Sequence, residues 1–326
     1  MSQIYYLTSS IANPDYKKTY ICDTMKAPFK PYAAIVFAEL CWGFSFIWTQ
    51  QLAGEQQIPV FVLLFVRMLI SAISMIAISL LVRSRLKIER QDIKWFLLLA
   101  FFEPFLYFIG ETFGIKATNS PTLSALIIAV IPIVTMFADM LFYKTKLAAI
   151  AKFGVLLTLP GTLLMVIKKD PSTSVYWWGI ALLMLAVFAS CSYSITVRRL
   201  VDKYSAITIN TWQFCIGAVF FLPFFLMTKG EFPVATLFQA PAIGPLLCLA
   251  ILCSCGAFSC YVFAIKNIGI TRACIFSATI PIVSATASYF MGIETFNWVE
   301  LLGIGVVITG VILAQRGRKK PSELIQ

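Results

Sequence analysis

The stretch Ile131-Pro132-Ile133-Val134 occurs twice in this chain, because the same four residues return as Ile280-Pro281-Ile282-Val283. The two copies are 149 positions apart (280 less 131), and this offset continues along the chain. Five further pairs are identical at that offset: Ala129 with Ala278, Ala138 with Ala287, Gly154 with Gly303, Gly161 with Gly310, and Leu164 with Leu313. Apolar composition alone would give roughly half of these nine identities or fewer. We therefore expect two halves of one design.

The composition indicates a membrane protein. Of the 326 residues, 60% are hydrophobic and 13% are charged, and the mean hydropathy is +0.86. Such a chain is too apolar for a water-soluble surface. A membrane-spanning helix needs about 20 mostly apolar residues. Ten apolar runs of suitable length lie at about 32–52, 60–82, 95–115, 121–143, 149–167, 175–197, 207–228, 243–265, 271–292 and 298–315.

The runs divide the chain into four parts. These are an N-terminal tail (1–31), a first five-helix repeat (32–168), a second five-helix repeat (174–316) and a C-terminal tail (317–326). The first tail is polar and basic and has no signal-peptide pattern. Met25 begins Met-Lys-Ala-Pro-Phe-Lys just before the first run, so we treat it as a second candidate for the true start.

The distribution of Lys and Arg predicts the orientation. With the N-terminal tail inside, the inner segments together hold 21 basic residues and the outer connections hold 4. Cytoplasmic segments of membrane proteins carry such an excess. We expect both termini in the cytoplasm. The net charge of +11 is interpreted as this topology signal and not as nucleic-acid binding.

Five spans in each half make the two halves cross the membrane in opposite senses. The expected fold is thus an all-α polytopic membrane protein with ten transmembrane helices in two inverted five-helix repeats. Transporters commonly use inverted repeats, with the substrate site near the midplane between the repeats.

Several short motifs strengthen this interpretation. They are Trp42-Gly43 in the first span, Phe65-Val66-Arg67 in the second, the paired Pro132 and Pro281, and Gly292-Ile293-Glu294 after the ninth. With ten spans in two halves, the chain from about residue 30 to 316 resembles the drug/metabolite transporter superfamily, EamA-type. The resemblance implies an inner-membrane carrier that exports amino acids or related small metabolites, often with the proton gradient.

One position departs from the family pattern. Where members commonly carry a glutamate after the fourth span, this chain has Tyr143-Lys144-Thr145, although the twin position keeps Glu294. We therefore expect the two halves to gate unequally.

The third span carries the clearest polar pattern. Glu103, Tyr107 and Glu111 are four residues apart, which places them on one side of a helix. A carboxylate in mid-bilayer costs about 3 kcal/mol and usually marks a pathway, although a structural glutamate bonded to a neighbouring helix is the alternative. Pro104 should disturb the backbone there. Glu103 is our candidate proton carrier, because burial favours the neutral form of a carboxyl group. The equivalent stripe in the eighth span reads Cys253, Ala257 and Tyr261, so its small residues leave room for a ligand.

Other candidates lie in spans one, two and seven. Arg67 is the only basic residue deep inside a span, and Glu39, Glu103 or Glu111 could pair with it. A structural ion pair and a grip on a substrate carboxylate are both compatible with this pattern. Further candidates for the cavity wall are Glu39, Trp42, Tyr107, Trp212, Gln213 and Tyr261, although packing explains Trp212 and Gln213 at least as well.

Pro132 and Pro281 are expected to kink their spans and act as paired hinges. Close helix packing is expected at Gly154, Gly161, Gly303, Gly305 and Gly310.

These patterns lead to one functional prediction and two alternatives. We expect a secondary-active transporter that exports amino acids or similar small metabolites by alternating access, with protons as the candidate coupling ion. The alternatives are an exchanger of phosphorylated or nucleotide-linked solutes and a non-transporting membrane scaffold. The chain has no histidine and no nucleotide-binding glycine motif, and eight of its nine cysteines lie in apolar runs. We therefore expect no enzyme, no cofactor and no metal site, and we expect a small-molecule substrate and the lipid bilayer as partners.

Overall fold

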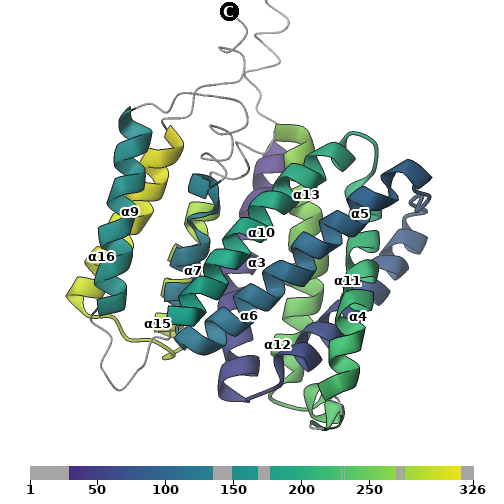
Figure 1. Ribbon diagram of the computed structural model, residues 1–326, viewed down its shortest axis with the longest axis horizontal. Coiled ribbons are helices and arrows are strands. Elements are labelled where there is room, and N and C mark those ends of the chain that lie inside the picture. Colours follow the sequence, from purple (N-terminus) through teal and green to yellow (C-terminus); the bar gives the residue numbers. More distant parts are fainter. Residues whose placement is uncertain are drawn as a thin grey trace, which may run out of the picture.

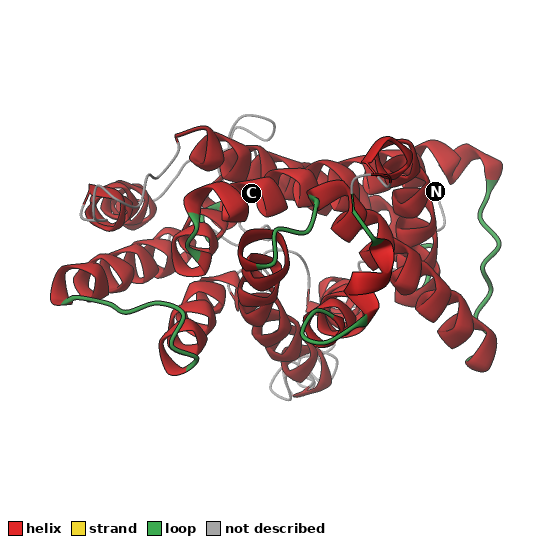
Figure 2. Ribbon diagram, turned by 90° about the horizontal axis from the view of Figure 1, so that it is seen from below, coloured by secondary structure: helices red, strands yellow, loops and turns green. Residues whose placement is uncertain are grey.

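The computed structural model describes residues 29–134, 149–167, 177–228, 230, 232–268, 273 and 276–316. Helices account for most of these residues, and no strand occurs among them (Figures 1 and 2). Met25, Tyr143-Lys144-Thr145, the C-terminal tail and nearly all of the N-terminal tail lie outside the described residues.

The first half contains the helices up to residue 167. They are α3 (Phe29–Thr49) continuing into the π-helix η1 (Gln50–Glu55), α4 (Val60–Leu81), the 3-10 turn η2 (Arg90–Asp92), α5 (Ile93–Ala100), the π-helix η3 (Phe101–Leu106), α6 (Tyr107–Thr118), α7 (Pro121–Ile128) and α9 (Ala149–Ile167). The second half repeats this order. It comprises α10 (Trp177–Val201), α11 (Ala206–Thr228), the 3-10 turn η5 (Val234–Phe238), α12 (Ile243–Leu247), the π-helix η6 (Cys248–Ala257), α13 (Phe258–Ile268), the 3-10 turn η7 (Phe276–Thr279), α15 (Ile280–Phe290) and α16 (Trp298–Arg316).

Six helical stretches in the described part are long and apolar enough to cross a bilayer. They are Phe29–Glu55, Val60–Leu81, Arg90–Thr118, Trp177–Val201, Ala206–Thr228 and Ile243–Ile268. Three further helices are also apolar but shorter: Pro121–Val134, Ile280–Phe290 and Trp298–Leu313. The chain is therefore a multi-pass, helical membrane protein. Six of the expected spans are confirmed by length and composition, and the count of ten stays a prediction.

Large apolar side chains cover much of the outer surface. Leu81, Phe290 and Trp298 are each more than 80% exposed. Helices suit this surface because each satisfies its backbone hydrogen bonds internally, as the hydrocarbon region of a bilayer requires. The apolar belt therefore faces lipid, whereas polar residues of the spans turn inward.

Contacts between the halves come in matched pairs. Helix α3 packs on η6 and α13, and α10 packs on η3 and α6. Likewise α3 contacts α15 while α10 contacts α7, and α4 contacts η6 while α11 contacts η3. Three helices of the first half also pack on their own counterparts in the second half: α4 on α11, α7 on α15, and α9 on α16. Such exchange of partners is the arrangement that a two-fold relation between the halves produces.

The pair α9 and α16 lies along one side of the bundle (Figure 1). A Cβ atom on Gly310 would lie 2.8 Å from the Gly154 carbonyl oxygen, and one on Gly161 would lie 2.9 Å from the Val307 nitrogen. These two glycines therefore allow the backbones to approach closely, as expected. Gly305 differs from the expectation, since no atom lies within 4 Å of its Cβ position.

Both central spans are interrupted at equivalent places. In the third span, Glu103 has extended backbone angles (φ −147°, ψ 116°) inside η3, directly before Pro104. Proline removes a backbone donor and disfavours helical angles in the residue before it, which explains the break. In the eighth span, η6 lies at the matching position but contains no proline. The first interruption follows from the sequence, and the second is visible only in the fold.

Candidate functional site

A buried cavity lies between the two halves. Its volume is about 50 Å³, which is room for several water molecules. Its wall comes from α3, α4, η3, α6, α7, α10, α13, η7 and α15 and the short helical turn at Ile131. Seven of the nine predicted cavity residues line it: Glu39, Trp42, Arg67, Glu103, Tyr107, Glu111 and Tyr261.

Arg67 is buried on α4 and faces this cavity. Its Nε donates a hydrogen bond to Ser254 Oγ at 3.2 Å, and its Cζ lies 4.0 Å from the centroid of the Phe108 ring. Among the described residues, only Lys203 and Asp92 form an ion pair within 4.0 Å. Arg67 therefore has no carboxylate at ion-pair distance, and its charge is stabilised by the aromatic face of Phe108 and by a hydroxyl.

Three carboxyl groups face the same cavity. Glu111 Oε1 accepts a hydrogen bond from Tyr107 Oη at 3.0 Å, one helical turn away on α6. Glu39 is 1% exposed, and its Oε2 has no hydrogen-bond partner in the described structure. Glu103 is 5% exposed. Three acids and one guanidinium in so small a space carry an excess of potential negative charge, which favours protonation of a carboxyl group or the arrival of a cationic group.

The expected stripe on the third span is not a continuous helical face. The extended backbone at Glu103 breaks the helical register between Glu103 and Tyr107, whereas Tyr107 and Glu111 remain one turn apart. All three nevertheless line the cavity. The interruption therefore changes how the Glu103 side chain is presented without removing it from the site.

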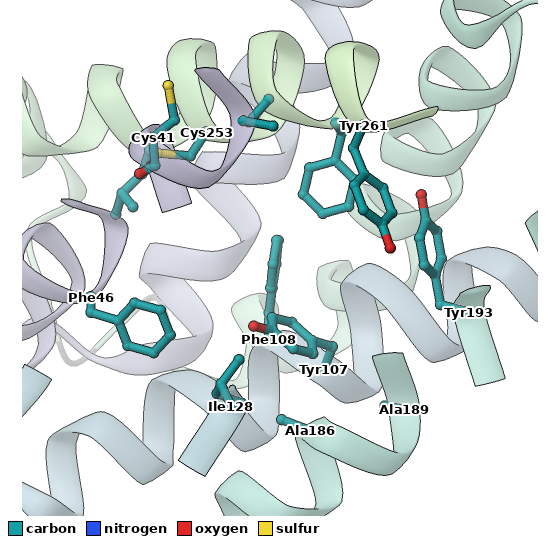
Figure 3. Packing of buried hydrophobic residues seen from close by; sticks show 14 of the residues in the cluster. Cys41, Phe46, Tyr107, Phe108, Ile128, Ala186, Ala189, Tyr193, Cys253 and Tyr261 are labelled. Carbon is teal, nitrogen blue, oxygen red and sulfur yellow. Dashed lines mark hydrogen bonds between the residues drawn. The ribbon is translucent and has the colours of Figure 1, made fainter. Parts of the chain in front are cut away.

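Aromatic rings form the rest of the wall. The Trp42 ring meets Phe258 and Tyr261 edge to face, with centroids 5.2 and 5.1 Å apart. Trp42 Nε1 donates to the Cys253 carbonyl oxygen at 3.3 Å, which ties α3 to η6. Figure 3 shows the rings of Tyr107, Phe108, Tyr193 and Tyr261, all of which line the cavity. Such rings offer apolar surface and electron-rich faces to a small ligand.

The other two predicted residues lie elsewhere. Trp212 does not line the cavity, because its Nε1 donates to the Leu86 carbonyl oxygen at 2.8 Å and so anchors α11 to the connection after α4. Gln213 is fully buried and also lies outside the lining, next to Tyr193.

Sequence reasoning missed several lining residues. Phe258, Phe108 and Tyr193 contribute aromatic wall, and Ser45, Ser190 and Ser277 contribute polar wall. Phe258 lies one turn before Tyr261, so helical periodicity could have found it. Tyr193 lies in the unusually polar run Ser190-Cys191-Ser192-Tyr193-Ser194, which was a usable signal. Ser254 carried no signal, since its role depends on the approach of α4 to η6.

The two prolines follow matching helix interruptions. Helix α7 ends at Ile128, and a two-residue turn precedes the helical segment that contains Pro132. The 3-10 turn η7 ends at Thr279, directly before α15, where Pro281 occupies the first turn. Ile131 and Ile280, the residues before the prolines, line the cavity. The breaks thus lie where movement would change the cavity wall.

Glu294 links the two halves away from the cavity. Its carboxylate accepts hydrogen bonds from Ser120 Oγ, from Thr122 Oγ1 and from the Thr122 backbone N–H, the last at 3.2 Å. Ser120 is the N-cap of α7, so the carboxylate lies at the positive end of that helix. We call this group of contacts the Glu294 latch.

Known proteins resemble most of this chain. The model of the EamA-like transporter family matches twice, over residues 29–167 and 177–315. An uncharacterized transporter of Archaeoglobus fulgidus is 24% identical over 286 residues, which cover 87% of this chain and 96% of the relative. The uncharacterized inner membrane transporter YicL of Salmonella typhimurium is 24% identical over 289 residues, covering 86% and 93%.

A protein of known crystal structure shares the fold. It is 15% identical in sequence, and it superposes with a TM-score of 0.64 over 87% of this chain and 96% of its own. The double match of the family model covers most of the residues that build the two halves and the cavity between them. This chain belongs to the EamA-like transporter family.

Proposed function

We propose that this protein is a secondary carrier of amino-acid-like, zwitterionic solutes that works by alternating access. One observation carries the proposal: a cavity between the halves holds three carboxyl groups, aromatic walls and Arg67, which has no carboxylate within 4.0 Å among the described residues. A solute with a carboxylate and an ammonium group would complement both kinds of charge.

Arg67 is the group that would bind the substrate carboxylate. Only its Nε is used by a described residue, so the terminal nitrogens keep their donors for a ligand. A guanidinium presents parallel donors that match the two oxygens of a carboxylate. Glu39, with an unpartnered oxygen, and Glu111 would bind the ammonium group.

Glu103 is the proposed proton carrier. It is buried, it lies in the interrupted part of the third span, and it shares the cavity with Arg67. A carboxyl group that faces each side of the membrane in turn can load and release a proton, which would couple the solute to the proton gradient.

Alternating access would use the two interrupted regions beside the prolines. The cavity has a volume of about 50 Å³, whereas ordinary ligand pockets measure roughly 300–1,000 Å³. Admission of a solute would therefore require the halves to move, with Pro132 and Pro281 as hinges and the Glu294 latch as one gate. We place both termini in the cytoplasm and take export as the direction of transport.

The alternative functions fit this cavity less well. An exchanger of phosphorylated solutes would need an excess of cationic groups, whereas this cavity has one arginine and three acids. A scaffold would not need a buried, unpaired arginine, which is costly to keep in a membrane.

Counterflow in proteoliposomes tests the proposal. Vesicles loaded with one amino acid should take up the same labelled amino acid, and a panel of amino acids, organic cations and phosphorylated solutes should identify the preferred class. Arg67→Gln should lower counterflow at least about tenfold, because a charge-assisted hydrogen bond contributes about 1.5–3 kcal/mol. Arg83→Gln, at an exposed position in the connection after α4, is the matched control and should transport normally.

Three results would contradict the proposal. Counterflow of no zwitterion in any member of the panel would argue for a scaffold, and a strict requirement for internal phosphate would argue for an anion exchanger. Arg67→Gln with unchanged counterflow would remove Arg67 from substrate binding. The melting temperature of Arg67→Gln in detergent separates a folding defect from a transport defect, because a variant that folds normally keeps the melting temperature of the unmodified chain.

A further inference from the structure

A second pocket lies apart from the central cavity, where the connection after α4 meets the connection between α10 and α11. Its volume is about 500 Å³, and it opens to solvent. Three cationic side chains line it, those of Arg85, Lys87 and Lys203, together with Glu89 and the hydroxyl groups of neighbouring residues.

Residues from both halves build this pocket and are bonded across it. Thr208 Oγ1 donates to the Arg85 carbonyl oxygen at 3.0 Å, and the Glu89 backbone N–H donates to Tyr204 Oη at 3.1 Å. The hydroxyl groups of Ser84 and Ser205 lie 3.3 Å apart. The pocket therefore has a defined shape, and a ligand in it would contact the first half and the second half at once.

The charge of the pocket is unbalanced. Lys203 Nζ is oriented by the Asp92 carboxylate at 3.1 Å, and this hydrogen bond raises the pKa of the Lys203 ammonium group. Arg85 and Lys87 have no carboxylate within 4.0 Å among the described residues. The Glu89 carboxylate accepts a hydrogen bond from the Gln91 side-chain amide. Because a neutral amide does not cancel the charge of Glu89, the lining holds three cations and one carboxylate, and with Asp92 beside Lys203 one positive charge is in excess, which suits an anionic group.

Exposed apolar side chains come just before and just after the first group of pocket residues in the sequence. Leu80, Leu81 and Val82, which precede it, are 70%, 83% and 56% exposed. Ile93 and Leu97, at the start of α5, are also exposed. This surface is suited to acyl chains beside a polar headgroup, whereas a soluble phosphate would make no use of it.

We infer that this pocket binds the phosphate group of an anionic phospholipid from the surrounding bilayer. Arg85 and Lys87 hold the headgroup, and the acyl chains lie along the exposed apolar residues at the end of α4 and the start of α5. Because the pocket is bonded across both halves, the lipid stabilises their contact on this side of the protein. The inference is independent of which solute the central cavity carries.

Lipid binding by the full chain in detergent tests this inference. The delipidated protein would be titrated with phosphatidylglycerol, with phosphatidylcholine and with inorganic phosphate, while native mass spectrometry counts bound lipid and the melting temperature reports stabilisation. Phosphatidylglycerol should bind and raise the melting temperature, and the other two should not. The variant Arg85→Gln/Lys87→Gln should bind phosphatidylglycerol about 30-fold more weakly, because each basic residue near the membrane surface contributes about 1 kcal/mol.

A matched variant removes two exposed charges of the same kinds outside the pocket. Arg90→Gln/Lys266→Gln should keep the affinity of the unmodified chain for phosphatidylglycerol. Equal weakening in both variants would show a general surface charge effect and overturn the site. An equal effect of inorganic phosphate would assign the pocket to a soluble ligand, and equal binding of phosphatidylcholine would show that the anionic headgroup is not recognised.

Discussion

At the scale of single residues, the central cavity brings together groups that are rare inside membranes. Arg67 comes from α4, Glu39 from α3, Glu103 from η3 and Glu111 from α6, and all four are at least 95% buried. Ionisable groups at such depth cost several kcal/mol unless they are paired, protonated or in contact with a ligand. The stacking of Arg67 on Phe108 and the unpartnered oxygen of Glu39 mark the positions where a ligand would compensate charge.

Glu103→Gln should separate exchange from proton coupling. Glutamine keeps the shape and polarity of the side chain but cannot carry a proton. Counterflow at equal pH should persist, whereas transport driven by a pH gradient should fall at least about tenfold in proteoliposomes. Glu55→Gln, an exposed glutamate in η1, should leave both activities unchanged. Transport by Glu103→Gln at the normal rate under a pH gradient would exclude Glu103 as the proton carrier.

At the scale of elements, the Glu294 latch joins the N-terminus of α7 to the connection between α15 and α16. Its three hydrogen bonds involve residues of different halves, so they must break if the halves separate there. Glu300, in the first turn of α16, is a nearby glutamate with a local role. Glu300 accepts a hydrogen bond from the Asn297 backbone N–H at 2.9 Å and thereby caps its own helix, α16.

This pair of glutamates allows a controlled test of the latch. Glu294→Ala should favour opening on that side by at least about tenfold, because hydrogen bonds to charged groups contribute about 1.5–3 kcal/mol each. The readout is the labelling rate, by a membrane-impermeant thiol reagent, of a cysteine placed at the fully buried Ser124. Thr122→Val should act in the same direction, and Glu300→Ala should not. Similar labelling rates for Glu294→Ala and Glu300→Ala would mean that the latch does not gate access.

The packing of α9 on α16 makes a prediction about stability. Gly310→Ala would place Cβ 2.8 Å from the Gly154 carbonyl oxygen, so the helices must separate and the melting temperature should fall. Gly305→Ala, five residues earlier on the same helix, meets nothing within 4 Å. It should be neutral or stabilise the protein by up to about 1 kcal/mol through helix propensity. A lower melting temperature for Gly305→Ala than for Gly310→Ala would be inconsistent with this packing.

At the scale of the whole molecule, the exchange of helix partners between the halves explains why one cavity lies between them. Helices α3 and α10 each pack on helices of the opposite half. The interrupted segments η3 and η6 lie at matching positions. In the proposed alternating-access carrier, an inverted two-fold relation would make the protein look alike from either side, so that one site could face each side in turn.

Single cysteines on a cysteine-free background test the predicted orientation. Positions 83 and 266 on the basic side should react only with reagent on the cytoplasmic side, and positions 55 and 297 only with reagent on the opposite side, because basic segments are retained in the cytoplasm. Labelling in intact cells and in permeabilised cells provides the measurement. Reaction of position 83 and position 55 from the same side would contradict the inverted arrangement.

Local properties of the chain were sufficient to predict a membrane protein with two related halves. They also identified seven of the residues that line the cavity. Hydropathy and helical periodicity depend on neighbours in sequence, so spans and polar stripes are visible without a structure. The break at Glu103 followed in the same way from Pro104.

Contacts between distant segments were decided only by the tertiary structure. The packing of α4, η6 and α11 decides two of these contacts. It places Arg67 beside Ser254, and it turns Trp212 away from the cavity toward Leu86. The Glu294 latch joins residues more than 170 positions apart, and the basic pocket joins connections more than 110 positions apart. Sequence alone determined which runs are apolar enough to enter a membrane. The packing of helices from both halves decided which residues meet, because side chains interact with their neighbours in space and not along the chain.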